Sequence, residues 1–285
     1  MRILLLGGKT GLLGQALKKT CDRRNWSTLC LGRHDDLFNA PALHRLITDE
    51  RITAIINTVA YTQVDKAEKQ PEEAARLNAD LPEILGKVAV SCAVPLVHYS
   101  TDFVFDGAKG SPYLPTDSPN PQSVYGQTKL EGEQRLLALG PQHVLILRTA
   151  WLFGPDKTNF VHKILGLARK HDRLTIVHDQ IGSPSCTTDV SEYCAALIEK
   201  QARGRYHVVN AGQASWYELA AQAVKLAGIS CRVEPIASAD FPQQAKRPPY
   251  SVLDHTDFEQ TAGITPRPWQ EALAEYIRQS RPNLP

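Results

Sequence analysis

Near its amino terminus the chain reads Arg2 to Leu6, a strand-length apolar run that leads directly into the glycine-rich turn Gly8-Lys9-Thr10-Gly11-Leu12-Leu13-Gly14. Apolar residues at helical spacing then predict a helix from about Leu12 to Arg23. Strand-length runs and amphipathic helical segments keep alternating through the first half. This alternation predicts an α/β fold, a doubly wound parallel sheet that is Rossmann-like.

The periodicity predicts the following elements after that first helix. The expected strands are Thr28–Leu31, Ala54–Val59, Pro95–Tyr99, Val144–Leu147, Leu174–Val177 and Tyr206–Val209. The expected helices are Pro41–Thr48, Pro71–Ser91, Val124–Leu139, Asn159–Arg169, Asp189–Lys200, Trp216–Ala227 and Trp269–Gln279.

Prolines interrupt the pattern more often after about Trp151. We therefore expect two domains: residues 1–150 bind a dinucleotide and carry the chemistry, and residues 151–285 form mainly a smaller C-terminal substrate-binding lobe. Some segments of the second part are expected to return to the first domain.

Composition excludes several classes of function. The net charge is +2 and no dense basic run occurs, so neither nucleic acid nor a membrane surface is an expected partner. The first apolar run is too short for a signal-peptide core, and a cytoplasmic protein is expected. The six cysteines form no C-x-x-C pair and no histidine stands at ligand spacing beside them, so no metal site is predicted.

The glycine-rich turn is the first candidate site. Glycines between a strand and a helix let the backbone approach a pyrophosphate at the helix N-terminus, which predicts cofactor binding by Gly8, Lys9, Thr10, Gly11, Leu12, Leu13 and Gly14. The spacing is G-x-x-G-x-x-G rather than G-x-G-x-x-G, and a plain strand-to-helix turn is the alternative.

The end of the second strand bears on cofactor choice. Arg33 stands where an acidic residue would select NAD, which favours NADPH, with NADH as a possible second cofactor. A solvated surface arginine is the alternative. The other expected cofactor-binding residues are Asp36, Leu37, Ala60, Tyr61, Thr62, Tyr99, Tyr125 and Lys129.

Tyr125 and Lys129 lie one turn apart on one face of a predicted helix. The lysine and an oxidised nicotinamide would favour the phenolate, so Tyr125 is the candidate proton donor to a carbonyl oxygen. Thr101, at the end of the fourth strand, can bond the same oxygen, although a turn or N-cap role is common for threonine. Asn78 is unusual in mid-helix: it either faces solvent or supports Lys129 through water.

Several segments together carry a resemblance. They are NTVAYTQVDKAE (57–68), HYSTDFVFDG (98–107), VYGQTKLEG (124–132), RTAW (148–151), DQIGSP (179–184) and Lys246-Arg247-Pro248. In this order they resemble the extended short-chain dehydrogenase/reductases, above all the branch that reduces the 4-keto group of dTDP-4-dehydro-L-rhamnose with NADPH to give dTDP-L-rhamnose.

The resemblance implies Tyr125 as proton donor with Lys129 and Thr101 as its partners, and Asp102 and Trp151 at a nucleotide sugar. Taken alone, Trp151 can equally be a core aromatic residue. Lys246-Arg247 can bind the diphosphate through charge-assisted hydrogen bonds or be an exposed basic pair.

One departure concerns assembly. Some members of the family dimerise through magnesium held by glutamates, but Cys186-Thr187-Thr188 stands where such a glutamate is expected. A monomer or weak homodimer is therefore expected. Two other functions stay open: a non-catalytic regulatory subunit, since a relative of this fold is the beta subunit of methionine adenosyltransferase, and a reductase or epimerase of another nucleotide sugar.

Overall fold

The computed structural model describes residues 1–32 and 34–280. Its centre is a six-stranded sheet in the order β10-β5-β4-β3-β1-β2, and every neighbouring pair is parallel. The strands are β1 (Arg2–Leu6), β2 (Ser27–Leu31), β3 (Ala54–Asn57), β4 (Leu96–Thr101), β5 (Val144–Thr149) and β10 (Gly204–His207). The predicted doubly wound parallel sheet is confirmed.

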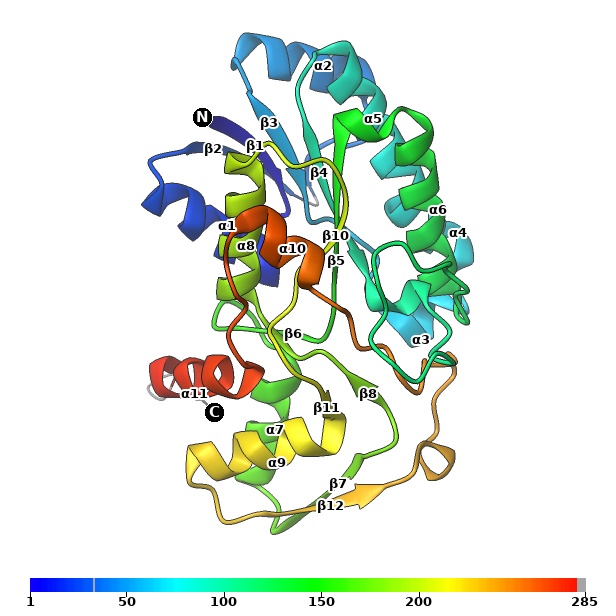
Figure 1. Ribbon diagram of the computed structural model, residues 1–285, viewed down its shortest axis with the longest axis vertical. Helices are drawn as coiled ribbons and strands as arrows, with labels where there is room; N and C mark the ends of the chain where they lie inside the picture. Colours follow the sequence, from blue (N-terminus) through cyan, green and yellow to red (C-terminus); the bar gives the residue numbers. More distant parts are fainter. Residues whose placement is uncertain (33, 281–285) are drawn as a thin grey trace.

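Helices cover both faces of this sheet (Figure 1). One face packs on α1 (Leu12–Arg23), α8 (Thr187–Glu199) and α10 (Thr256–Ala262). The other packs on α2 (Ala40–Asp49), α5 (Leu81–Ser91) and α6 (Val124–Ala138). Because the central strands are buried on both sides, they are continuous apolar runs rather than alternating ones.

A second, smaller hydrophobic core lies below the sheet in Figure 1. Two parallel strands pair there, and α9 packs on both of them. The elements of this region are β6 (Leu152–Phe153), α7 (Phe160–Ala168), β7 (Arg173–Val177), β8 (Ile181–Gly182), β9 (Ser185–Cys186), β11 (Ala214–Ser215), α9 (Trp216–Ala227), β12 (Arg232–Ile236), η4 (Ser238–Asp240) and α11 (Trp269–Ser280).

The strand order reverses at β1. From β1 the chain moves outward to β2, then returns to the other side of β1 as β3. At such a reversal the loops after the two central strands diverge and leave a crevice at their carboxyl ends, where ligands of this fold bind. The loops after β1, β3 and β4 carry three of the sequence-predicted groups of site residues.

The predicted helix from 71 to 91 is interrupted. It consists of α4 (Pro71–Ala75), the π-helical turn η1 (Arg76–Asp80) and α5. Pro82 lies in the first turn of α5, where its ring crowds the carbonyl four residues earlier, which widens the turn. That carbonyl belongs to Asn78, and a Cβ on Gly132 of α6 would lie 2.1 Å from its oxygen. The wide turn therefore lets α6 approach closely.

Three short segments complete the fold: α3 (Val64–Ala67) and the 3₁₀ turns η2 (Asp102–Val104) and η3 (Pro141–His143). The segments α3, α10 and β12 were not among the predicted elements. Among the described residues, no helix combines the length and the apolar character that a membrane crossing requires.

Candidate active site

The turn after β1 is built around glycines that no other residue can replace without a clash. Gly7 has a φ of +88°, and its carbonyl accepts from the Gly11 amide at 2.9 Å. A Cβ on Gly14 would lie 2.2 Å from the Gly7 oxygen. Gly11 is the N-cap of α1 and supplies no side-chain acceptor to the first turn of the helix. The cradle therefore fits a cofactor pyrophosphate, with amide donors of α1 at its edge.

The carboxylate of Asp35, shortly after the end of β2, lies near this turn. Asp35 accepts from the Gly32 amide at 2.7 Å and from the Lys9 ammonium at 2.9 Å, and these bonds lower the pKa of its carboxyl. Asp36 is exposed, whereas Leu37 is buried in the core beneath α2. Arg33 lies outside the described residues.

The loop after β3 carries the next predicted group. Ala60 is half-buried, Thr62 is exposed, and the hydroxyl of buried Tyr61 donates to Gln70 at 2.5 Å. Asn78 accepts from the Tyr61 amide at 2.8 Å and donates to Thr128 at 3.1 Å. The prediction that Asn78 faces solvent is therefore wrong: it is buried, and its side chain joins the β3 loop to α6. Support of Lys129 through water stays a prediction.

Helix α6 positions Tyr125 and Lys129. Ser123 caps its first turn, and the Val124 amide donates to Glu68 of the α3 segment at 2.9 Å. A Cβ on Gly126 would lie 2.3 Å from the Phe103 carbonyl oxygen, so a glycine is needed for α6 to approach the end of β4. The Tyr125 and Phe103 rings meet edge to face at 5.5 Å.

Tyr125 is protonated at neutral pH. Burial raises the pKa of its phenol to about 12, the Thr101 hydroxyl opposes this, and the charge of Asp102 adds to it. The side chain thus holds a proton that it can deliver to an acceptor in the crevice.

Lys129 is almost completely buried, at 2% exposure. Its ammonium donates to the Tyr99 carbonyl at 2.6 Å and lies 3.3 Å from His98 Nε2. Burial lowers the pKa of Lys129 to about 8, with the charge of Glu133 opposing the shift. The Tyr99 ring points the other way, into the core beside Cys194. Strand alternation places the Tyr99 ring on the face opposite His98, and cofactor binding by Tyr99 stays a prediction.

Thr101 is the N-cap of η2, as its alternative interpretation predicts: its hydroxyl accepts from the Phe103 amide. The same hydroxyl donates to Asp102 at 3.0 Å, and Ser251 donates to the other carboxylate oxygen at 2.6 Å. Burial raises the pKa of Asp102 to about 6 despite these two bonds.

Trp151 stands where the chain leaves β5, with a φ of +47°. Its indole stacks on Trp216 at 3.5 Å between ring centres, and a Cβ on Gly182 would lie 2.5 Å from the ring. The side chain is half-buried and joins the two hydrophobic cores around it. It forms an aromatic wall at the boundary between the sheet and the second core.

The loop 244–247 is held against α3 by Asp65. Asp65 accepts from the Gln244 and Ala245 amides at 3.2 and 3.1 Å and from Arg247 Nη2 at 2.9 Å. Burial of the carboxyl is outweighed by these bonds, which lower the pKa of Asp65. Arg247 Nη1 is buried without a partner among the residues that the structure describes. Lys246 bonds Gln122 instead, at 2.9 Å.

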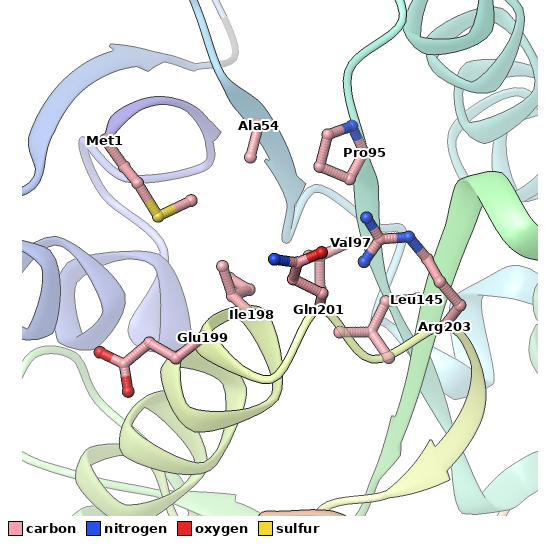
Figure 2. A pocket seen from close by; sticks show the side chains of 9 residues that line it. All are labelled: Met1, Ala54, Pro95, Val97, Leu145, Ile198, Glu199, Gln201 and Arg203. Carbon is pink, nitrogen blue, oxygen red and sulfur yellow. The ribbon is translucent and has the colours of Figure 1, made fainter.

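A separate pocket lies at the other end of the sheet (Figure 2). Its wall includes Ala54 and Pro95, which open or precede β3 and β4, together with Ile198 near the end of α8. Tyr125 instead packs on Phe103, just after the carboxyl end of β4, so the two regions are distinct. Within residues 1–32 and 34–280, no three His, Cys, Asp or Glu side chains are grouped to hold a metal ion.

The reversed strand order, the glycine cradle and the Tyr125 and Lys129 pair define a Rossmann-fold protein of the short-chain dehydrogenase/reductase class. Within that class, the chain belongs to the family described as RmlD substrate binding domain, which it matches over residues 1–281.

Individual relatives agree with this assignment. The chain is 36% identical to a dTDP-4-dehydrorhamnose reductase of Streptomyces griseus over 95% of its length and 91% of the relative's. A crystal structure of a dTDP-4-dehydrorhamnose reductase from Clostridium acetobutylicum superposes with a TM-score of 0.94 at 39% identity, covering 99% of this chain and 100% of that one. The Bacillus anthracis enzyme in complex with NADP gives 0.93 at 29% identity, covering 98% and 99%.

Several residues of this region were not predicted from the sequence. His98, Asp65, Ser251 and Trp216 were assigned no role of their own. For His98 a signal existed, because alternation along β4 places its side chain on the face opposite Tyr99. For Ser251 and Asp65 no local signal exists, since their partners are 149 and up to 182 residues away.

Proposed function

We propose that this chain reduces the 4-keto group of dTDP-4-dehydro-L-rhamnose with NADPH and forms dTDP-L-rhamnose. The observation that carries the proposal is the buried Lys129 one helical turn from Tyr125, whose hydroxyl interacts with that of Thr101 at the carboxyl end of β4. The names of the relatives support the same reaction.

The chain's own groups account for the proton side of this reaction. NADPH, when bound, supplies the hydride that adds to the carbonyl carbon. Tyr125 donates its phenolic proton to the carbonyl oxygen, and Thr101 orients that oxygen by hydrogen bonding. Lys129 then stabilises the phenolate by its charge.

The residues that bind the cofactor and the substrate are also part of the proposal. Residues 1–150 bind the dinucleotide, and residues 151–285 mainly form the substrate-binding lobe. Trp151 flanks the sugar, Asp102 lies at the nucleotide sugar, and Arg247 pairs with the diphosphate. The buried, unpartnered Nη1 of Arg247, among the described residues, supports an anion at this position.

A substrate panel tests the activity. Purified protein is mixed with NADPH and dTDP-, UDP- or GDP-linked 4-keto sugars, and NADPH oxidation is followed with product identification. We expect oxidation with the dTDP sugar and no requirement for a partner protein. Preferential turnover of another sugar nucleotide would assign a different reductase or epimerase. No turnover alone, but altered activity of another enzyme, would favour the regulatory subunit.

NADPH is the proposed cofactor, with NADH as a weaker one, and Arg33 is the proposed ligand of the extra phosphate. Asp35 is compatible with this choice, because its carboxylate is bonded to the Lys9 ammonium and the Gly32 amide, which offset its repulsion of that phosphate. Arg33→Ala is expected to weaken NADPH more than NADH by roughly 1.5 to 3 kcal/mol. Equal losses of affinity for both cofactors would reject this role.

The assembly and location are also proposals. We propose a monomer or weak homodimer that works in the cytoplasm, without nucleic acid or membrane as a partner. Sedimentation over a range of protein concentrations, with and without magnesium, tests the first part. A tight dimer that requires magnesium would overturn it.

A further inference from the structure

His98 lies in the middle of a buried chain of polar groups that connects β3 to α6. Its side chain has no solvent exposure. Its Nδ1 lies 3.1 Å from Asn57 Nδ2, and its Nε2 lies 3.3 Å from Lys129 Nζ. At each contact two nitrogens face each other, so a hydrogen bond forms only if one of them carries a proton and the other has a free lone pair.

The amide of Asn57 fixes the first proton position. Its Oδ1 accepts from the Val59 backbone amide at 3.0 Å. The amide group of Asn57 therefore turns its Nδ2, a donor, toward His98. Because Nδ2 can only donate, Nδ1 of His98 must be the acceptor.

The tautomer of His98 follows from this. Burial and the charge of Lys129 lower the pKa of His98 well below its usual value, so the imidazole is neutral. A neutral imidazole that accepts at Nδ1 carries its proton on Nε2. This N–H points at Lys129 Nζ. An ammonium there has three donors and no acceptor, whereas a neutral amine has a lone pair that can accept from the Nε2–H.

We infer that Asn57 and His98 are positioning residues that fix one imidazole tautomer and thereby favour the neutral amine of Lys129 over its ammonium. Asn57 acts through His98, and His98 acts through Lys129.

The other groups around Lys129 do not remove this bias. Glu133 on α6 favours the ammonium, but its carboxylate is held by Arg148 of β5 in two bonds of 2.9 and 2.6 Å. The Tyr99 carbonyl accepts from either form of Lys129. The other titratable groups of the site are Tyr125, which is on the same helix as Lys129, and Asp102, which follows the end of β4.

The inference deepens the proposed function and, in its catalytic consequence, rests on it. After Tyr125 has given its proton to the carbonyl oxygen, it is a phenolate. An N–H bond of the Lys129 ammonium then breaks as the phenolic O–H re-forms, which leaves the amine. The Nε2–H of His98 stabilises that amine by donating to it, and a proton from solvent restores the ammonium.

The tautomer is tested without any activity. The ¹⁵N spectrum of histidine-labelled protein distinguishes the two neutral tautomers and the imidazolium, and His98→Gln identifies the signal of His98. We expect the neutral form protonated on Nε2 across the range from about pH 6 to pH 9, in which a free histidine loses its charge. A proton on Nδ1, or an imidazolium in this range, overturns the inference.

The effect on Lys129 is tested by its own titration. The ¹³Cε signal of Lys129, identified with Lys129→Met, is followed against pH in the wild type, Asn57→Asp and His98→Gln. A carboxylate at position 57 accepts from Nδ1–H and reverses the tautomer, and a glutamine can turn its oxygen to the ammonium. We expect both variants to titrate higher by about one pH unit.

His207→Gln is the matched control, because this histidine is equally buried on β10 and bonds the Asp254 carbonyl at 3.0 Å instead. An unchanged midpoint in both test variants, or an equal shift in the control, overturns the inference. These titrations report on Lys129 even if every sugar in the substrate panel proves inactive, so failure of the inference and failure of the proposed function are distinguished.

Discussion

The hydroxyl of Ser251 donates a 2.6 Å hydrogen bond to the carboxylate of Asp102, although the two residues are 149 positions apart. Both side chains are buried, at 2% exposure each. The bond ties the chain that returns from the second core to the turn that ends β4, next to Thr101. A buried carboxylate that loses such a donor keeps the cost of its desolvation.

Ser251→Ala should therefore lower the free energy of unfolding by about 1 to 3 kcal/mol. Ser100→Ala is the control: its hydroxyl is also buried, but it has no hydrogen-bond partner among the described residues. Chemical denaturation of both variants at pH 7 measures the difference. Equal stability of the two variants would show that the bond contributes nothing.

Asp102 should also make stability depend on pH. Its pKa in the folded protein is raised by burial from 3.8 to about 6, so the folded state binds this proton more tightly than the unfolded chain. Protonated Asp102 thus adds to the free energy of unfolding. This contribution is fully present below about pH 4 and is lost as the pH rises through about 6, a change of roughly 3 kcal/mol. Asp102→Asn removes the titration.

The measurement is the free energy of unfolding of the wild type minus that of Asp102→Asn, from pH 4 to pH 7. We expect this difference to fall as the pH rises. A flat difference would mean that Asp102 has an ordinary pKa in the folded protein.

The reaction itself gives a third prediction. Tyr125→Phe should reduce turnover by about 100- to 10,000-fold because it removes the proton donor but keeps the ring against Phe103. NADPH affinity, measured by fluorescence titration, should hardly change. Lys129→Met serves as the comparison and should impair both turnover and cofactor binding. Near-wild-type turnover of the phenylalanine variant would remove Tyr125 from the mechanism.

The parts of this site that lie close together in the sequence could be predicted from it. The strand, glycine turn and helix at residues 2–23 are continuous in the chain, and the Tyr125 and Lys129 spacing follows from one helical turn, so both were predictable. The direction of the Tyr99 ring was also predictable, because side chains alternate between the two faces of a strand. Contacts that join distant segments have no such local rule.

The interruption at Asn78 shows a different limit. Periodicity alone predicts one helix over residues 71–91, and it contains no information on how closely α6 must approach. The wide turn results from Pro82 together with the contact between Gly132 and the Asn78 carbonyl, which is a property of the assembled helices. Only the tertiary structure reveals that Asn78 fixes the loop after β3.

The contact of Asp65 with loop 244–247 gives the last prediction. Asp65→Asn keeps the shape of the side chain, but it removes the charge that pairs with Arg247 and weakens its acceptance from the Gln244 and Ala245 amides. If Arg247 binds the substrate diphosphate, its guanidinium should then be less well oriented. We expect KM for the nucleotide sugar to rise about fivefold, the factor equivalent to about 1 kcal/mol, with kcat and NADPH affinity nearly unchanged.

Asp240→Asn is the matched control, since Asp240 is an exposed carboxylate shortly before the same loop and the variant makes the same change of charge. Its KM should equal that of the wild type. Arg247→Ala should raise KM further, and adding Asp65→Asn to it should have little extra effect, because Asp65 acts on the substrate through Arg247. Additive losses in the double variant would instead mean that Asp65 supports the substrate site independently of Arg247.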